Sequence, residues 1–294
     1  MNEFSKVGIF YAAGAYILWG VLPIYWKLLD KVSAFEILAS RFVWSCVFVA
    51  LLILFTGKAK QFIADTKLVF SDYKRALALL CAAITISFNW GIFIWAVTAG
   101  RIVETSMGYY INPLVSVLFG VAFLHERLDR LQIYAVICAA IGVFMMIWNL
   151  GILPWISVSL AFTFALYGLI KKYLPIAAIS SIMWETIIIS PIALYYEHGL
   201  FAQGLSSYTQ VDTLHLCLLV GAGAVTATPL ILFTAGAKLL PLKIVGFLQY
   251  FAPTISLFIG IFMYGEPFTA SHLLSFGWIW FGLFLFIISQ LRVK

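Results

Sequence analysis

Two charged side chains, Arg41 and Glu185, stand well inside long apolar stretches of the sequence. Charged groups at membrane depth are costly, and they usually face a cavity or a partner. A carboxyl group in such a place can load and release protons, because burial disfavours its charged form. Glu185 is therefore the candidate for proton coupling. The alternative is a structural carboxyl that pairs with a neighbouring side chain or a helix terminus.

Three roles are open for Arg41. Its planar guanidinium could bind a substrate carboxylate through two parallel hydrogen bonds. It could instead extend to the outer lipid headgroups, or it could pair with Glu36, about one helical turn away. Arg41 and Glu185 occupy roughly equivalent places in the two halves of the chain, on opposite sides of the membrane midplane. The sequence therefore does not require a salt bridge between them.

Other polar and aromatic side chains within the apolar stretches complete a candidate substrate cavity. Ligand pockets are mostly apolar and aromatic, with a few placed polar groups. With Arg41 and Glu185, the predicted cavity comprises Trp19, Thr85, Asn89, Trp90, Tyr109, Asn112, Tyr167, Thr228, Gln249 and Tyr250. The alternative for each of these residues is an interhelical hydrogen bond or aromatic packing. Thr226, beside Thr228, belongs to the same inventory.

The composition excludes a water-soluble globule. The chain has 294 residues, of which 64% are hydrophobic and 10% charged, and its mean hydropathy is +1.05. Soluble domains are about 45–50% apolar and about 25% charged. So little charge would leave a soluble fold unable to cover its own surface, and the sequence predicts a polytopic membrane protein.

The apolar residues form ten continuous runs, each about long enough for one helix across a bilayer. They are continuous rather than alternating, which favours helices over a transmembrane barrel. The runs cover residues 8–26, 36–55, 75–98, 104–124, 131–148, 155–170, 180–197, 214–236, 244–263 and 270–289. The longest connections are 56–74 and 198–213, which leave no room for a soluble domain.

Basic residues predict the orientation, because cytoplasmic loops of membrane proteins retain Lys and Arg. With the N-terminus inside, 14 of the 18 Lys and Arg residues fall on the cytoplasmic side and three on the outer side, with Arg41 within a span. Both termini are therefore expected in the cytoplasm. The same bias accounts for the net charge of +6 without a nucleic-acid partner.

A repeat relates the two halves of the chain. Pro113, Ser116, Gly120 and Glu126 are matched 140 positions later by Pro253, Ser256, Gly260 and Glu266, and Tyr110, Gly142 and Phe144 by Tyr250, Gly282 and Phe284. Five spans in each half is an odd number, so the second half must insert upside down. The sequence thus predicts two inverted five-helix repeats, 1–150 and 151–294, an arrangement common in secondary transporters and also found in channels.

The repeated Pro-Ser-Gly pattern has two interpretations. Small residues four positions apart let two helices approach closely, which makes Ser116, Gly120, Ser256 and Gly260 candidates for a packing seam. Pro113 and Pro253 each free a backbone carbonyl and permit a bend. The same residues are therefore also candidates for a hinge that moves as a central site alternates.

Several segments resemble the RarD-type permeases of the EamA family, within the drug/metabolite transporter superfamily. They are Trp19–Lys27 (WGVLPIYWK), Glu36–Ser45 (EILASRFVWS), the block Asn89–Leu128, and Tyr167–Lys172 (YGLIKK). The resemblance covers nearly the whole chain, with one departure at Ser40, where the family pattern has His. It implies ten helices in two repeats in the plasma membrane, and export, or sometimes import, of small organic metabolites or drugs. It also implies a central cavity lined by the first, third, fourth, sixth, eighth and ninth spans, with the fifth and tenth peripheral and able to pair in a homodimer.

Motifs of other chemistries are absent from the sequence. It has no phosphate-binding G-x-x-x-x-G-K-[ST] loop and no H-E-x-x-H or G-x-S-x-G motif, so we expect no catalytic residues, no metal and no cofactor. We predict a secondary transporter of small molecules that works by alternating access and is possibly proton-coupled. The alternatives are a channel, a membrane-embedded enzyme acting on a lipid-linked substrate, and a receptor or scaffold.

Overall fold

The computed structural model describes residues 3–99, 101–150, 155–265 and 269–292, and within these ranges all regular structure is helical. The elements are α1 (Glu3–Lys27), α2 (Ala34–Phe55), α3 (Ala59–Phe70), α4 (Tyr73–Thr98), α5 (Ile102–Leu124), α6 (Arg130–Leu150), α7 (Trp155–Tyr173), α8 (Ala178–Ala202), the short 3-10 helix η1 (Ser207–Thr209), α9 (Thr213–Leu239), α10 (Leu242–Leu248), α11 (Phe251–Tyr264) and α12 (Ala270–Arg292). All ten predicted runs coincide with helices.

Among the described residues, nine segments are long and apolar enough to cross a membrane, counting α10 and α11 as one. The helix that forms over the remaining predicted run, α7, is not one of the nine, since its last turn carries Lys171 and Lys172. The protein is therefore a multi-pass membrane protein, and the tenth span stays a prediction. The run 244–263 is interrupted near Gln249 and Tyr250, where α10 ends and α11 begins.

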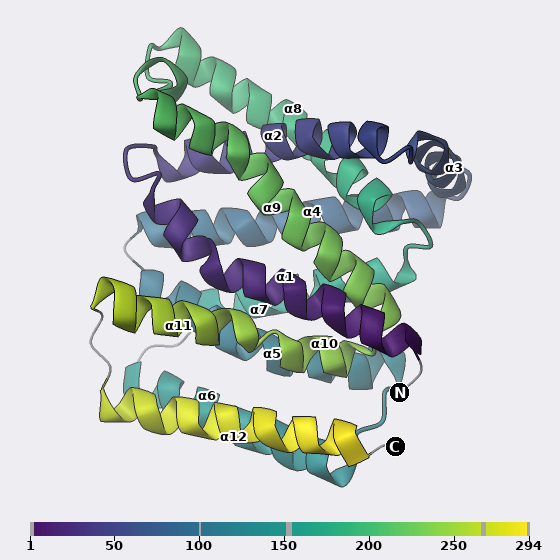
Figure 1. Cartoon of the computed structure of the whole chain (residues 1–294), viewed down its shortest axis with the longest axis vertical. Helices are drawn as coiled ribbons and strands as arrows, with labels where there is room; N and C mark the ends of the chain where they lie inside the picture. The colour runs from purple at the N-terminus through teal and green to yellow at the C-terminus, as the bar shows by residue number, and fades with distance from the viewer. Residues whose placement is uncertain (1–2, 100, 151–154, 266–268, 293–294) are drawn as a thin grey trace.

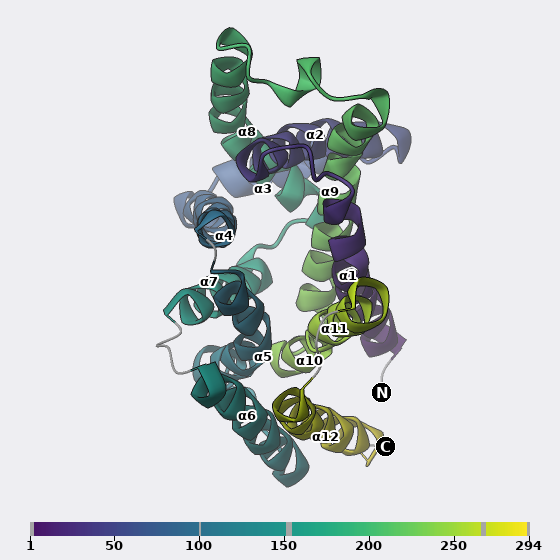
Figure 2. The same cartoon turned by 90° about the vertical axis from the view of Figure 1, so that its left-hand side faces the viewer.

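The helices of the two chain halves interleave rather than form separate lobes. In the first half, α1 packs on α9 and α11, α2 on α8 and α9, α4 on α7, α5 on α7 and α10, and α6 on α12. Figures 1 and 2 both show α6 and α12 side by side at one end of the molecule, and α2 and α8 at the other. The start of α1 and the end of α12 lie on the same side of the molecule, at the right in Figure 1.

Two glycines 140 positions apart hold α6 against α12. A Cβ on Gly142 would lie 2.5 Å from the Ser275 carbonyl oxygen and 2.8 Å from the Ile279 side chain, and one on Gly282 would lie 2.7 Å from the Ala135 carbonyl oxygen. The contact is reciprocal, because Ser275 itself stands 140 positions after Ala135. Only the absence of side chains at both glycines permits so close an approach.

The repeated Pro-Ser-Gly segments also lie at helix contacts. In the first half, a Cβ on Gly246 of α10 would meet the Pro113 carbonyl oxygen at 2.9 Å. In the second half, the Ser256 hydroxyl donates to the Gly20 carbonyl, 3.0 Å away in α1. Both segments end in a left-handed residue, His125 at φ 53° and Gly265 at φ 66°, whose N–H bonds the carbonyl of Gly120 or Gly260. Glu266 lies outside the described residues.

The connection 56–74 is not a plain loop, because it contains α3. The Asp65 carboxylate accepts hydrogen bonds from the Ala177 N–H at 3.0 Å and the Ser180 hydroxyl at 2.6 Å, and so caps the start of α8. The Trp184 indole donates to the Thr66 hydroxyl at 2.9 Å. Helix α3 is too short and too polar to register as an apolar run, so the sequence analysis missed it.

The close α6–α12 contact predicts that adding a single methyl group at either glycine lowers the stability of the fold. Gly142→Ala and Gly282→Ala should each lower the free energy of unfolding by about 1–3 kcal/mol, because the new Cβ overlaps backbone of the facing helix. The measurement is thermal unfolding in detergent. Gly277→Ala, on the same helix pair with open space around it, is the matched control. Equal melting temperatures for all three variants would contradict the packing described.

Candidate functional site

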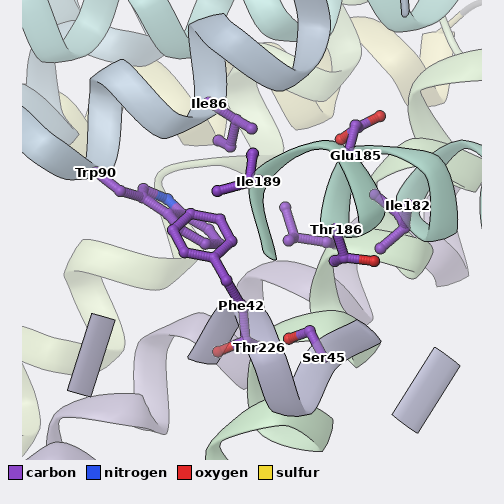
Figure 3. A pocket seen from close by; sticks show the side chains of 10 residues that line it. Phe42, Ser45, Ile86, Trp90, Ile182, Glu185, Thr186, Ile189 and Thr226 are labelled. Carbon is purple, nitrogen blue, oxygen red and sulfur yellow. The ribbon is translucent and has the colours of Figure 1, made fainter. Parts of the chain in front are cut away.

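A small cavity of about 20 Å³, lined mostly by buried residues, lies between α2, α4, α8 and α9. It is lined by Phe42, Ser45, Ile86, Trp90, Ile182, Glu185, Thr186, Ile189, Thr226 and Leu230 (Figure 3). This volume holds about one water molecule, so a substrate would enter only when the surrounding helices separate. Of the predicted cavity residues, Trp90 and Glu185 line this space. Helices α2 and α8, the second and seventh predicted spans, were not among the expected lining helices.

Glu185 is fully engaged by its neighbours. Its Oε2 accepts a hydrogen bond from the Tyr167 hydroxyl at 2.8 Å, and its Oε1 accepts one from the Ser181 hydroxyl at 2.9 Å. Oε1 also forms a salt bridge with the Lys171 ammonium. Lys171 is 0% and Glu185 3% exposed, so the pair is buried.

The Lys171 contact corrects the sequence analysis, which counted Arg41 and Glu185 as the only charged groups well inside the spans. Lys171 was assigned to a cytoplasmic loop, yet α7 continues to Tyr173 and turns this lysine inward. Residues four apart share a helix face, so Tyr167 and Lys171 of α7 together meet Ser181 and Glu185 of α8. That spacing was the available signal, and the positive-inside interpretation obscured it.

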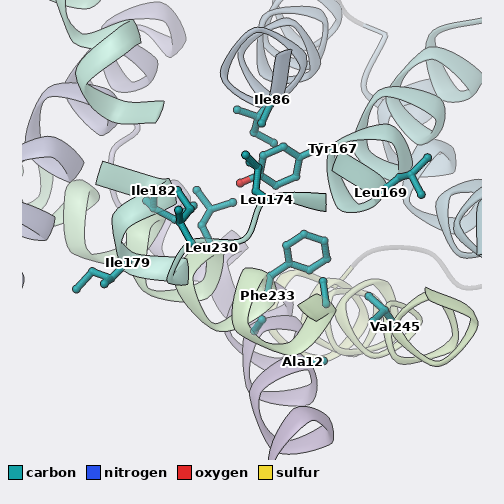
Figure 4. Packing of buried hydrophobic residues seen from close by; sticks show 14 of the residues in the cluster. Ala12, Ile86, Tyr167, Leu169, Leu174, Ile179, Ile182, Leu230, Phe233 and Val245 are labelled. Atoms are coloured by element: carbon teal, nitrogen blue, oxygen red, sulfur yellow. The ribbon is translucent and has the colours of Figure 1, made fainter. Parts of the chain in front are cut away.

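An aromatic core supports this cluster. The Tyr167 ring stacks on Phe233 with centroids 6.0 Å apart and an interplanar angle of 13°. Trp19 packs on the same phenylalanine at 5.7 Å. Figure 4 shows Tyr167 and Phe233 facing each other among the buried residues. Trp19 therefore has the aromatic-packing environment that was the alternative to lining the cavity.

Arg41 is held at the edge of the cavity by aromatic rings and a hydroxyl. Its Nε donates to the Thr226 hydroxyl at 2.9 Å. The guanidinium carbon lies 4.3 Å from the centre of the Trp90 ring and 4.7 Å from that of Trp26. Since Trp90 and Thr226 both line the cavity, the arginine stands beside it.

The expected alternative of an Arg41–Glu36 pair is wrong. The Glu36 carboxylate accepts hydrogen bonds from the Ser206 hydroxyl at 3.2 Å, the Ser207 N–H at 2.7 Å and the Ser207 hydroxyl. These partners lie in and beside η1, so Glu36 ties the start of α2 to the connection between α8 and α9.

The other predicted cavity residues fall into separate places. Asn89 donates to the Leu160 carbonyl at 2.8 Å and joins α4 to α7. The Ser116 hydroxyl donates to Gln249 at 3.2 Å and lies 3.4 Å from the Asn112 side-chain oxygen, which joins α5 to the α10–α11 junction. Tyr250 is buried, Tyr109 is half-exposed, and Thr85 and Thr228 are partly buried. These seven predicted residues do not line the cavity.

The sequence is similar to known transporters along its whole length. The model of the EamA-like transporter family matches residues 6–148. The transporter YojE of Bacillus subtilis is 44% identical over 290 residues, which cover 99% of this chain and 96% of YojE. Protein RarD of Salmonella typhimurium is 38% identical over 291 residues, covering 99% of this chain and 97% of RarD.

The chain belongs to the EamA family and is a RarD-type permease. It is therefore a membrane transporter of small molecules and not an enzyme. A solved crystal structure with 14% sequence identity superposes with a TM-score of 0.71 over 95% of this chain and 96% of its own, which shows a shared fold. Within the described part of this permease, no group of three or more His, Cys, Asp or Glu residues could hold a metal ion.

The buried Lys171–Glu185 pair of this RarD-type permease predicts that replacing one partner destabilises the fold more than replacing both. Lys171→Met should lower the free energy of unfolding by about 3–5 kcal/mol, because it leaves the Glu185 carboxylate buried without its counter-charge. The double variant Lys171→Met, Glu185→Leu should recover most of that loss. Unfolding in detergent measures both, with Lys172→Met on the same turn as the control. If the double variant is no more stable than the single one, Lys171 does not stabilise the fold through its pair with Glu185.

Proposed function

We propose that this permease is a secondary transporter that exports small organic molecules by alternating access through the cavity between α2, α4, α8 and α9. The observation that carries the proposal is a small, mostly buried cavity whose helices are joined by polar contacts on both sides of it. Alternating access requires one layer to open while the other stays closed. Helix α8 illustrates the order, because its cavity-lining residues, from Ile182 to Ile189, lie between Ser181, which bonds Glu185, and Glu197.

The layer nearest the start of α2 consists of exchangeable hydrogen bonds. Besides the Glu36 contacts, the Ser40 hydroxyl donates to Glu197 at 2.9 Å and accepts from the Tyr208 hydroxyl at 2.8 Å. Tyr208 in turn accepts from the Trp44 indole at 2.8 Å. Because these bonds join α2 to α8 and η1, breaking them would free the connection between α8 and α9.

The opposite layer consists of ionic contacts to the α7–α8 connection. The Lys171–Glu185 pair joins the end of α7 to α8. The Lys238 ammonium donates to the Leu174 carbonyl at 2.8 Å and to the Ile176 carbonyl, and so attaches the end of α9 to the same connection. Separating α7 from α8 on this side would require the buried pair to break or to change its protonation.

Inverted repeats over 1–150 and 151–294 would make the two layers related by a pseudo-twofold axis. The reciprocal contacts of Gly142 and Gly282 support this, since a two-fold contact is one in which each partner uses the same surface. The match of the family model to residues 6–148 supports a boundary near the middle of the chain. In this arrangement the protein lies in the plasma membrane and both termini are in the cytoplasm. The outward faces of α6 and α12, with Phe144 60% and Phe284 57% exposed, are where a homodimer would form.

Proton coupling would act on Glu185. A proton on this carboxylate would remove the attraction for Lys171 and loosen the layer that joins α7 to α8. Substrate leaving the cytoplasm in exchange for an entering proton would then couple export to the proton gradient. The substrate would be released on the outer side, where Glu185 takes up the entering proton.

Exchange in proteoliposomes tests the carrier mechanism. Liposomes preloaded with unlabelled amino acids, purine derivatives and drug-like compounds should take up a labelled member of one class saturably, with no ion gradient present. Uniform, non-saturating leak would identify a channel instead. If folded protein takes up no member of the pool, the receptor hypothesis would have to be considered again.

Glu185→Gln tests the coupling, since glutamine keeps the size of the side chain and one accepting oxygen but cannot carry the exchanged proton. We expect loss of transport driven by a pH gradient and retention of exchange without a gradient. Glu104→Gln is the matched control, because Glu104 is 4% exposed and paired with Arg101 away from the cavity. Unchanged pH-driven transport in Glu185→Gln would remove this carboxylate from the mechanism.

A further inference from the structure

We infer that the transported molecule is an organic monocarboxylate with an apolar body, and that its carboxylate binds the guanidinium of Arg41 between Trp26 and Trp90. This inference rests on the proposed function and names the class of substrate for the same cavity. It follows from the charged groups around the cavity rather than from the size of the cavity, which holds about one water molecule.

Arg41 is a cation beside the cavity that no ion pair neutralises. Within the described part of the chain, no acid lies within salt-bridge distance of its guanidinium. The hydrogen bond described for its side chain uses Nε alone, toward Thr226. The two terminal nitrogens therefore remain available as a fork, the arrangement that binds a carboxylate through two parallel bonds.

The surroundings stabilise this cation only in part. The Trp90 and Trp26 rings, at 4.3 and 4.7 Å, present the negative faces of their π-systems to the guanidinium. Arg41 is partly buried, and two indole rings do not replace a full counter-charge at membrane depth. An anionic ligand would supply that counter-charge and would gain from a guanidinium already fixed in place.

The other charged groups at the cavity neutralise each other. Lys171 and Glu185 form a buried pair, and both oxygens of Glu185 already accept hydrogen bonds from Tyr167 and Ser181. No carboxylate oxygen among the cavity-lining residues is thus left for a ligand ammonium. Arg41, beside this lining, is a cation without an ion-pair partner, which matches a monoanion better than a zwitterionic amino acid.

The remaining lining is suited to a hydrocarbon or aromatic body. Phe42, Ile86, Ile189 and Leu230 are apolar, and the Phe42 ring lies 5.2 Å from Trp90 (Figure 3). Thr226, Ser45 and Thr186 contribute the few hydroxyls, and they already have partners in Arg41, the Gly223 carbonyl and the Met183 carbonyl, respectively. A ligand would therefore be recognised by one anionic group and by its apolar surface.

Transport of a monoanion carries charge across the membrane. A potential of 100 mV, negative inside, favours the outward distribution of a monoanion by about 50-fold. Export of such a substrate would therefore be driven by the membrane potential even without proton exchange. A zwitterion or a neutral molecule would gain nothing from the potential.

The test uses three probes that share a phenyl ring and differ in charge: phenylacetate, L-phenylalanine and phenylacetamide. Binding to the purified permease is followed by isothermal titration, and exchange is followed in proteoliposomes. Phenylacetate should bind and exchange at least tenfold better than either other probe. A potassium-diffusion potential set with valinomycin should speed phenylacetate movement toward the positive side and leave phenylalanine unaffected.

Arg41 variants assign the effect to the guanidinium. Arg41→Lys keeps the charge and loses the fork, and should weaken phenylacetate binding about tenfold; Arg41→Gln should weaken it about 100-fold, the range expected for charge-assisted hydrogen bonds. Arg101→Lys is the matched control, because Arg101 also lies over a tryptophan ring, 5.4 Å from that of Trp155, but is paired with Glu104. It should bind phenylacetate as the unaltered protein does.

The outcomes separate this inference from the proposed function. Binding of phenylacetate that depends on Arg41, without exchange, would uphold the anion site and overturn the carrier mechanism. Saturable exchange of phenylalanine or phenylacetamide in preference to phenylacetate would uphold the carrier and overturn the inference. Phenylacetate binding that is equal in Arg41→Gln and in the unaltered protein would also overturn it.

Discussion

A charge that lies at membrane depth must find its compensation inside the protein, and the architecture around the cavity follows from that constraint. Lys171 and Glu185 compensate each other, with Tyr167 and Ser181 completing the hydrogen bonds of the carboxylate. Arg41 is compensated by two indole rings and one hydroxyl, and the hydrogen bond described for it leaves its two terminal nitrogens available. The first arrangement is complete without a ligand, and the second is not, so the two charged centres serve different purposes.

Close helix contacts make these centres part of one packed unit while leaving room for rearrangement. Gly223 shows how close the contacts are, since a Cβ there would come within 2.2 Å of the Trp44 backbone. Such a contact positions α2 against α9, and thereby Arg41 against Thr226. The layers that close the cavity consist instead of side-chain hydrogen bonds and one ion pair. These bonds exchange more easily than glycine-mediated backbone packing, so we expect movement to occur at the layers while the helix pairs move as units.

The sequence predicted the parts of this structure that depend on composition and periodicity. The continuous apolar runs located the helices, and their rare charges identified Arg41 and Glu185 as residues in need of partners. The partners themselves were harder to predict. Lys171 looks like an ordinary cytoplasmic lysine at a helix end, and only the register of α7 against α8 shows that it faces inward. Helix α3 is amphipathic rather than apolar, and the break between α10 and α11 depends on tertiary packing around Gln249. The scattering of Asn89, Asn112 and Gln249 over separate contacts arises for the same reason, because polar residues in membrane helices join helices as often as they line cavities.

Accessibility of the cavity from the two sides of the membrane is the most direct test of the central claim that this cavity opens alternately. Thr186 lines the cavity and is close in size to cysteine, so Thr186→Cys would be introduced after the four native cysteines are replaced. A membrane-impermeant maleimide would then be applied from the inside or the outside of oriented vesicles, with and without phenylacetate. We expect Thr186→Cys to be labelled from either side, and we expect substrate to raise the labelling rate on one side while lowering it on the other. Rates from the two sides that rise and fall together would contradict it and indicate a continuous pore.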